Sequence, residues 1–338
     1  MTDPVEAALR RLNGCRALIV GDLVLDSYLY GETGRVSREA PVVVVEKRSM
    51  EYRLGGAANT AANLSALGVA TTVLSSLGNE SGADELESRL EAAGVDVVAA
   101  RHAAVTTAVK TRVLAGAHGT TKQQVLRIDE TPRLPLPRSC QLELVNTLRQ
   151  LAPVADVVVV SDYGLGVVDT PVIAELRELV RNGVLVCADS RHRLLEFSPV
   201  TAITPNLPEA ESATGLRLDS DASVDQAGQL LLEKLDCRAV LLTLGRGGMR
   251  LFRPEQGPHH VAIVGEDEVT DVTGAGDTVI ATFAAAIASG LGMINAMCIA
   301  NVAAGVVVNK MGCAVATPDE IAQSARRNHV ELEAWAGS

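Results

Sequence analysis

The stretch that decides the fold is Asp271-Val-Thr-Gly-Ala-Gly-Asp-Thr278, which runs directly into the apolar segment 279–289. A Gly-x-Gly turn that opens a helix presents unpaired backbone N–H groups and the positive end of the helix dipole, and both favour a bound phosphate. Asp277 is out of place in such an anion site, because its carboxylate would repel phosphate. Proton removal from a hydroxyl that attacks the phosphate would explain it. The stretch therefore predicts phosphoryl transfer with Asp277 as the base.

Composition narrows the class of protein. Hydrophobic residues make up 47% of the 338 residues, enough for a large core. The formal net charge of −11 leaves no excess of Lys and Arg to neutralise phosphates at large, so we expect neither nucleic-acid nor membrane-surface binding. The six cysteines lack metal-site spacing, residues 1–16 hold no signal-peptide run, and the apolar stretch 279–308 is interrupted by Gly and Asn. We therefore expect a cytoplasmic protein with free thiols.

Apolar runs typical of buried strands alternate with helical patterns along the chain. The strand-like runs are 17–20, 72–77, 157–160, 184–188, 202–203 and 240–243. The helical patterns include 57–67, 82–93, 139–151, 171–181 and 224–234. Strands that are apolar on both faces and alternate with helices predict a parallel sheet covered by helices. One doubly wound α/β domain is the simplest organisation.

Two segments, 28–53 and 106–129, break this alternation. Both are rich in Val, Thr and charged residues and look like extended strands. Strands that do not fit the βαβ order are candidates for a small separate β layer. The alternative is a pair of ordinary surface hairpins.

Two further motifs carry polar groups suited to sugar hydroxyls. In Arg53-Leu-Gly-Gly-Ala-Ala-Asn59, Gly55 and Gly56 allow the backbone to approach a ligand closely, and Asn59 can present its amide one turn later. The alternative is a helix start that packs on the sheet. Asp26 follows the first expected strand, and ligands gather at the carboxyl ends of strands in open α/β sheets. Asp22 is the weaker candidate, because an Asp directly after a strand more commonly caps a turn.

Together these motifs resemble the two signatures of the ribokinase-like (phosphofructokinase-B) sugar kinases, in the same order. The resemblance implies a three-layer α/β/α sandwich with a central, mainly parallel sheet. It also implies a small β lid over the sugar, often paired with its twin in a homodimer. Asp277 would be the catalytic base, and the amides of Gly274, Ala275 and Gly276 would form the anion hole. The sugar would contact Asp26, Gly55, Gly56 and Asn59.

The resemblance further implies an ATP site and bound cations. Asn206 and Glu209 match the family's Asn-x-x-Glu element, which organises Mg²⁺ and its waters around the triphosphate. Without the resemblance, Asn206 is typical of a turn and Glu209 of the first turn of a helix. The positions that match nucleotide-binding stretches are Asn206, Thr243, Gly245, Gly248 and Asn301. Asp271 and the carbonyl of Thr273 match positions that bind a K⁺-type ion in many relatives.

Within this family the chain is most similar, from about residue 16 to 322, to the D-glycero-D-manno-heptose 7-phosphate kinases. Val36-Ser-Arg-Glu-Ala-Pro41 and Ser161-Asp-Tyr-Gly164 are among the stretches that carry the likeness. The implied reaction transfers the γ-phosphoryl group of Mg·ATP to heptose 7-phosphate and gives the 1,7-bisphosphate. The cationic donors that a sugar phosphate requires would be Lys110, Arg112 and Arg127. A salt-bridged face of the lid explains these three equally well.

Departures from this subgroup keep alternatives open. Ser27, Leu165 and Arg191 stand where the subgroup has Arg, Lys and Lys, and such donors are not equivalent. The alternatives are another kinase of the family, acting on ribose, fructose, fructose 6-phosphate or a nucleoside, and a sugar-binding protein that has lost the chemistry. We expect a kinase domain over 12–322, with the lid in about 28–53 and 106–129, and a tail over 323–338. No nucleotidyltransferase domain, and hence no adenylylation, is expected.

Overall fold

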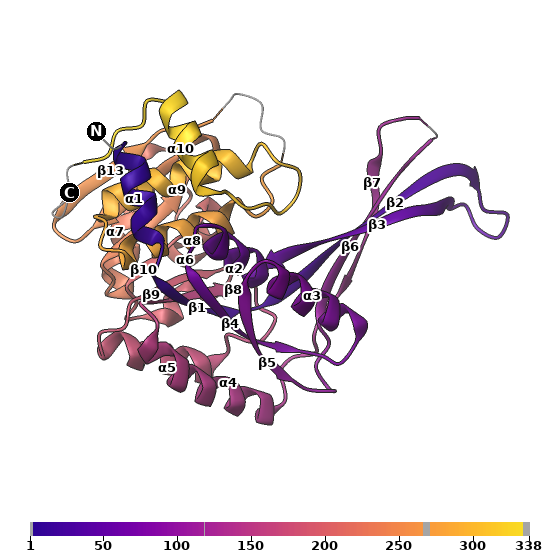
Figure 1. Cartoon of the computed structure of the whole chain (residues 1–338), viewed down its shortest axis with the longest axis horizontal. Helices are drawn as coiled ribbons and strands as arrows, with labels where there is room; N and C mark the ends of the chain where they lie inside the picture. Colours follow the sequence, from indigo (N-terminus) through magenta and orange to yellow (C-terminus); the bar gives the residue numbers. More distant parts are fainter. Residues whose placement is uncertain (1–2, 118, 266–270, 334–338) are drawn as a thin grey trace.

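Two sheets make up the framework of the chain, one in an α/β body and one in an arm that extends from it (Figure 1). The computed structural model describes residues 3–117, 119–265 and 271–333. The strands of the body sheet, in spatial order, are β13 (Gln256–Val261), β12 (Met249–Arg253), β11 (Ala239–Thr243), β10 (Ala202–Ile203), β9 (Val186–Ser190), β8 (Val157–Asp162), β1 (Arg16–Gly21), β4 (Ala70–Leu77) and β5 (Val95–Arg101). Neighbours from β11 to β5 pair in parallel, whereas β12 and β13 are antiparallel additions at one edge.

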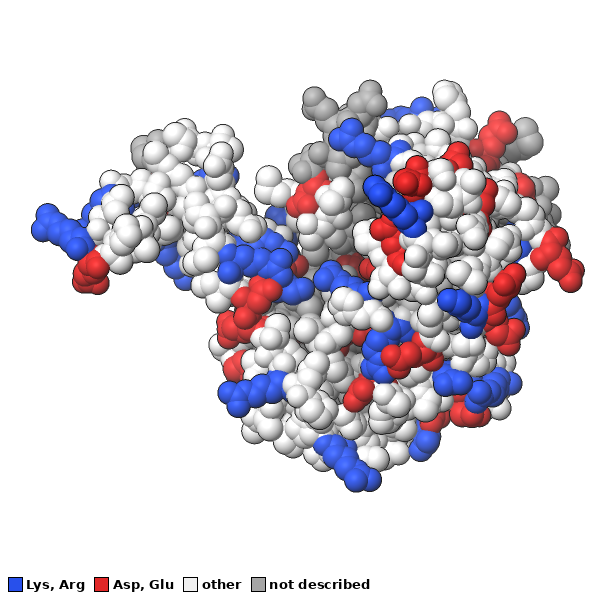
Figure 2. Space-filling view, turned by 180° about the vertical axis from the view of Figure 1, so that it is seen from behind, with Lys and Arg blue, Asp and Glu red and all other residues white. Residues whose placement is uncertain are grey.

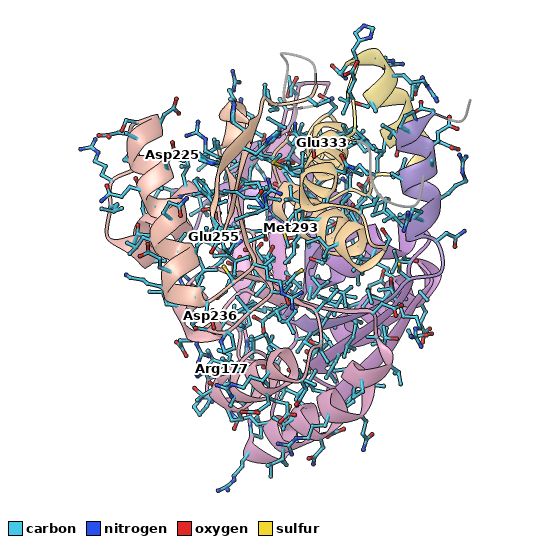
Figure 3. The ribbon with its side chains drawn as sticks, turned by 90° about the vertical axis from the view of Figure 1, so that its left-hand side faces the viewer. Arg177, Asp225, Asp236, Glu255, Met293 and Glu333 are labelled. Atoms are coloured by element: carbon cyan, nitrogen blue, oxygen red, sulfur yellow. The ribbon has the colours of Figure 1, made fainter. Side chains whose placement is uncertain are left out.

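Helices cover both faces of the body sheet. One face carries α1 (Pro4–Leu12), α2 (Ala57–Ala66), α3 (Ser81–Ala92), α8 (Ala275–Ala288), α9 (Met293–Val307) and α10 (Pro318–Arg327), and the other carries α4 (Arg138–Leu151), α5 (Thr170–Arg181), α6 (Leu207–Thr214) and α7 (Asp221–Leu235). Along β1, Ile19 packs into the first core and Leu18 into the second, as strand geometry requires. Asp225 of α7 and Met293 of α9 lie on opposite sides of the sheet (Figure 3). Burial on both faces explains the continuous apolar runs in the sequence.

The arm is a twisted four-stranded sheet that projects from one end of the body (Figure 1). Its strands, in spatial order, are β3 (Val43–Gly56), β2 (Leu23–Val36), β6 (Ala108–Gly116) and β7 (Gln123–Glu130). Only Asp22 separates β1 from β2, so a nearly continuous stretch of chain runs from the body into the arm. The outer strand β7 is exposed at every position.

The predicted alternation of strands and helices is confirmed, and the apolar stretch 279–308 forms the two buried helices α8 and α9. Within the described residues, no helix is long and apolar enough to cross a membrane. The sequence analysis predicted neither β5 nor the β12–β13 edge. The strands β5 and β13 are largely half-exposed or exposed, and β12 is buried but Arg250 interrupts its apolar residues. The expected tail boundary at 322 falls inside α10, and the N–H of Glu333, labelled in Figure 3, donates to Asn295.

Candidate active site

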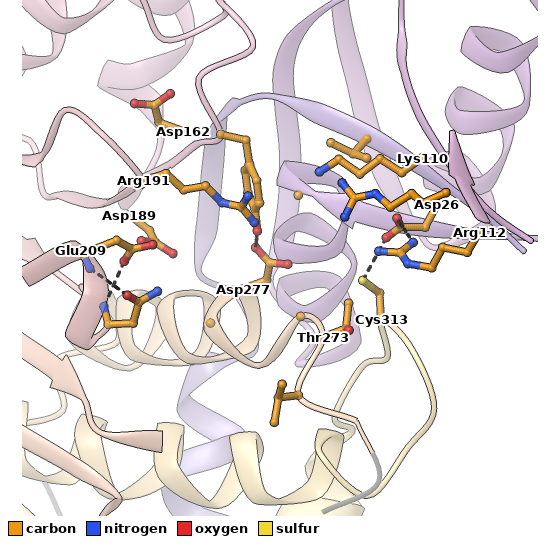
Figure 4. A pocket seen from close by; sticks show the side chains of 18 residues that line it. Asp26, Lys110, Arg112, Asp162, Asp189, Arg191, Glu209, Thr273, Asp277 and Cys313 are labelled. Carbon is orange, nitrogen blue, oxygen red and sulfur yellow. Dashed lines mark hydrogen bonds and ion pairs between the residues drawn. The ribbon is translucent and has the colours of Figure 1, made fainter. Parts of the chain in front are cut away.

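A cavity of about 370 Å³ opens where the arm joins the body, at the carboxyl ends of β8 and β9 (Figure 4). This edge is where ligands bind in open α/β sheets. The predicted site residues that line it are Asp26, Gly56, Lys110, Arg112, Arg127, Asn206, Glu209, Thr273, Gly274, Gly276 and Asp277. Side chains outside the predicted set also line it, namely those of Val24, Asp162, Tyr163, Asp189, Arg191, Val272 and Cys313.

Asp277 lies in the first turn of α8, with only 3% of its surface exposed. Its Oδ2 accepts a hydrogen bond from the Asn59 amide at 2.9 Å, and its Oδ1 accepts from the hydroxyls of Thr60 at 3.2 Å and Tyr163 at 2.8 Å. Burial raises the pKa of Asp277 to about 6, although these hydrogen bonds act in the opposite direction. The carboxylate is therefore ionised at neutral pH and has a pKa suited to a general base.

The turn before α8 opens toward the cavity. Gly274 is the N-cap with φ 80°, and a Cβ there would lie 2.5 Å from the Asn59 amide nitrogen, so this position requires glycine. The N–H of Ala275 donates to the Val272 carbonyl at 3.3 Å. Among the described residues, the N–H groups of Gly276 and Asp277 have no acceptor. These two amides and the helix dipole are thus available to an anion.

Acidic side chains line the side of the cavity near α6 (Figure 4). Asn206 and Glu209 form a reciprocal capping box at the start of α6, with both hydrogen bonds at 3.0 Å. Asp189, the last residue but one of β9, lies nearby, and none of the described residues donates a hydrogen bond to its carboxylate. Burial and the neighbouring Glu209 and Asp277 hold the pKa of Asp189 well above its usual value. A divalent cation would relieve this repulsion.

The donor set fits Mg²⁺ better than a transition metal. Carboxylate and amide oxygens suit this hard ion, which keeps several waters and needs few protein ligands. Within the described part of the chain, no group of three or more His, Cys, Asp or Glu side chains could hold a metal. Asn206, Glu209 and Asp189 are the residues that would hold Mg²⁺, partly through water.

Basic side chains line the opposite side, from the strands of the arm (Figure 4). Arg112 pairs with Asp26 at 2.5 Å, and Arg127 pairs with Asp129 at 2.6 Å. Lys110 pairs with no carboxylate of the described residues and lies 5.5 Å from the centre of the Tyr163 ring. Burial, together with Arg191, lowers the pKa of Lys110. In Figure 2, Lys and Arg side chains gather where the arm meets the body.

Two residues expected to contact the sugar lie behind other side chains of the site in this structure. Asn59 is 2% exposed and lies behind Asp277, because its amide donates to that carboxylate. Gly55 lies behind Asp26, since a Cβ at Gly55 would come within 2.6 Å of the Asp26 carboxylate. The two residues thus leave room for Asp26 and orient Asp277, and neither lines the cavity.

The expected nucleotide and K⁺ positions meet the cavity only in part. Thr243, Gly245, Gly248 and Asn301 lie outside its lining. Asn301 is buried in α9 and donates to the Ala262 carbonyl at 2.6 Å. Asp271 accepts hydrogen bonds from the N–H and hydroxyl of Thr273 and from the N–H of Gly312, and these fasten the turn before α8.

The sequence analysis did not name two aspartates that line the cavity, Asp162 and Asp189. Asp162 is the last residue of β8 and Asp189 the last but one of β9, so both lie at the edge where ligands bind. The signal in the sequence was an Asp at the carboxyl end of a buried strand, which we applied only to the first expected strand. Ser27, by contrast, is buried on the face of β2 opposite Asp26, so the missing arginine at this position does not line the cavity.

Solved structures share this fold. Phosphofructokinase-2 from Escherichia coli, in complex with substrates and products, has a TM-score of 0.79 at 16% identity, over 94% of this chain and 100% of its own. Ribokinase from Arabidopsis thaliana, complexed with ribose and ATP, has a TM-score of 0.70 at 20% identity, over 92% of this chain and 98% of its own. The fold is therefore ribokinase-like, as expected from the sequence.

Sequence relatives are closer. The bifunctional protein HldE of Trichlorobacter lovleyi is 38% identical over 96% of this chain and 66% of its own length, and that of Methylococcus capsulatus is 40% identical over 91% and 63%. The chain thus spans about two thirds of the length of these curated relatives. The sequence profile of the pfkB family of carbohydrate kinases matches residues 17–320. The chain belongs to the pfkB family and is an ATP-dependent carbohydrate kinase.

Proposed function

We propose that the chain transfers the γ-phosphoryl group of Mg·ATP to a hydroxyl of a sugar phosphate, D-glycero-D-manno-heptose 7-phosphate, and gives the 1,7-bisphosphate. The observation that carries this proposal is Lys110, a half-buried ammonium that faces the cavity without a carboxylate partner among the described residues. A buried cation without a partner is costly, and a substrate phosphate would supply the missing charge. The likeness to heptose 7-phosphate kinases supports the same substrate.

In this mechanism the two sides of the cavity hold the two substrates, with Asp277 between them (Figure 4). Asp277 takes the proton from the attacking hydroxyl as the bond to the γ-phosphorus forms. The free N–H groups at the start of α8, those of Gly276 and Asp277, would bind the phosphoryl oxygens. When bound, Mg²⁺ offsets the charge of the triphosphate.

The sugar side is assigned to the arm. Asp26 would accept a hydrogen bond from a sugar hydroxyl, and Lys110, Arg112 and Arg127 would bind the phosphate. Arg112 and Arg127 would then exchange a carboxylate partner for the phosphate, whereas Lys110 would gain its first. Because Arg112 and Arg127 would each lose an ion pair on binding the phosphate, Lys110 would contribute most to phosphate affinity.

The nucleotide side is assigned to α6 and the turn after β11. Asn206, with Glu209 and Asp189, would hold Mg²⁺ at the triphosphate, and Thr243, Gly245, Gly248 and Asn301 would lie toward the ribose and base. We further propose that Asp271 and the Thr273 carbonyl bind K⁺.

Two copies of the chain would pair through the arm. The arm sheet exposes Val43, Val125, Leu126 and Ile128, each about half exposed or more. Exposed apolar strands of this kind mark an interaction surface. The cytoplasm is the compartment that suits ATP-dependent chemistry, and the six cysteines are unpaired. A homodimer in the cytoplasm is therefore the proposed working form.

The test is Mg·ATP-dependent ADP release by the purified chain with heptose 7-phosphate, fructose 6-phosphate, fructose, ribose and adenosine. We expect turnover that is largely confined to heptose 7-phosphate. A preference for fructose, ribose or adenosine would overturn the phosphate assignment. That outcome has one structural argument in its favour, because Arg112 and Arg127 already hold carboxylate partners.

A further inference from the structure

Tyr163 links the base to the two sides of the cavity. Its hydroxyl donates to Oδ1 of Asp277 at 2.8 Å. The guanidinium of Arg191 lies 4.3 Å from the centre of its ring, and the ammonium of Lys110 lies 5.5 Å from it. Cations at these distances are attracted to the face of the ring. The residue therefore contacts the base and both cations at once.

The hydrogen bonds of Asp277 leave one acceptor position of its carboxylate unused. An ionised carboxylate offers about four acceptor positions, two on each oxygen. Thr60 and Tyr163 occupy both positions on Oδ1, and Asn59 occupies one on Oδ2. Among the described residues, no other group donates to Asp277. One acceptor position on Oδ2 is therefore left for a substrate hydroxyl.

We propose that Tyr163 is a positioning residue for phosphoryl transfer. Its hydroxyl fills Oδ1 of Asp277 and fixes the carboxylate so that Oδ2 receives the proton of the attacking hydroxyl. This inference rests on the proposed function, since it names the part of the same site that orients the base. Tyr163 does not contact the reacting atoms and exchanges no proton.

Buried aspartates hold the Tyr163 loop in place. Asp22 accepts three backbone hydrogen bonds from this loop, from the N–H groups of Tyr163 at 2.8 Å, Leu165 at 3.0 Å and Val167 at 3.1 Å. Asp162 accepts from the N–H of Gly164 at 2.9 Å and from the Ser190 hydroxyl at 2.6 Å. The backbone that carries Tyr163 is thus held in place, and its hydroxyl in turn holds Asp277. A fixed donor of this kind is what the orientation of a base requires.

The hydroxyl remains a donor throughout the neutral range. Burial, followed by the charges of Asp277 and Asp189, holds the pKa of Tyr163 well above its usual value. The titratable and charged groups that face Asp277 are Tyr163, Arg191, Asp189 and Cys313. All except Tyr163 are unchanged in Tyr163→Phe, so a difference in pH profile between this variant and the wild type reports the hydroxyl alone.

The test is Tyr163→Phe, which keeps the ring and its contact with Arg191. We expect kcat at pH 7 to fall by about tenfold to a hundredfold, with KM for both substrates within about threefold. The acid limb of kcat should move upward by about one pH unit, because a hydrogen bond to a carboxylate stabilises its ionised form. The matched control is Tyr52→Phe, whose hydroxyl contacts Met50 outside the cavity.

A second measurement does not depend on turnover. Carboxyl ¹³C NMR of protein labelled at aspartate, with Asp277→Asn to assign the resonance, gives the pKa of Asp277 without substrates. We expect a higher pKa in Tyr163→Phe than in the wild type and in Tyr52→Phe. An unchanged pKa, or a loss of kcat without movement of the acid limb, would overturn the proposal. A wild type that fails to phosphorylate any sugar phosphate would instead overturn the proposed function, while the NMR titration would still test the contact.

Discussion

Replacing Asp22 by Ala removes the acceptor that holds the 163–167 loop. Three backbone N–H groups lose their partner, each at about 1–3 kcal/mol. The carboxylate itself is costly to bury, because burial raises its pKa from 3.8 to about 6, equivalent to about 3 kcal/mol at pH 8. At about 2 kcal/mol each, the three amides outweigh this relief, so we expect Asp22→Ala to lower the free energy of unfolding by about 3 kcal/mol at pH 8.

Because the pKa of Asp22 is raised in the folded state, the stability lost in Asp22→Ala depends on pH in a known direction. The folded pKa is raised, so the stability that Asp22 contributes is complete below the unfolded pKa of 3.8 and is lost as pH rises through about 6. The deficit of Asp22→Ala should therefore be larger at pH 5 than at pH 8, by about 1 kcal/mol. Urea unfolding at both pH values measures it.

The control is Asp96→Ala, an exposed position on β5 where we expect a change below about 0.5 kcal/mol. Asp22→Ala should also lower kcat, because the loop carries Tyr163. A variant as stable as the wild type at both pH values would refute the reasoning, and so would a deficit of equal size at pH 5 and pH 8.

Three further outcomes are expected. Asp277→Asn should lower kcat by a factor of about 10² to 10⁴, because an amide cannot take the proton. The affinity for ATP, measured by calorimetry, should stay within a few fold of the wild-type value. Near-normal turnover would exclude Asp277 as the base. In the wild type, kcat/KM should fall about tenfold per pH unit below about pH 6, as Asp277 becomes protonated, and a flat profile down to pH 5 would contradict this assignment. Lys110→Met should raise KM for the sugar phosphate at least about tenfold and leave KM for ATP within about threefold. The control Lys47→Met, on the exposed part of the arm, should change neither KM value. Equal KM values for Lys110→Met and the wild type would show that Lys110 does not bind the phosphate.

The sequence predicted the layers of the fold well because their cause is local. Val157 to Val160 form a run that is buried on both faces, and only a central strand gives such a pattern. The 271–278 stretch likewise carries its own chemistry, since a glycine turn, a helix start and an aspartate are neighbours in the chain. The structure places all three at one cavity.

The roles of the supporting residues could not be predicted in the same way. Asn59 has an amide side chain suited to a sugar hydroxyl, yet in the structure it donates to Asp277, which lies 218 positions away in the sequence. Tyr163 meets the same carboxylate across 114 positions. Such pairs depend on how α2, α8 and the loop after β8 pack together, and no local pattern encodes them. The sequence therefore predicts the base, while the orientation of the base is a property of the tertiary structure.

The passage of the chain from β1 to β2 through Asp22 alone gives the arm no flexible joint. Any bending of the arm toward bound sugar must be absorbed at this point, where the N–H of Asp22 donates to Ser161 and its carbonyl accepts from Ala57. Asp26, the proposed sugar ligand, lies four residues onward, and the Asp22 carboxylate accepts a hydrogen bond from the N–H of Tyr163. The proposed sugar side and the loop that orients the base are therefore joined by a single strand.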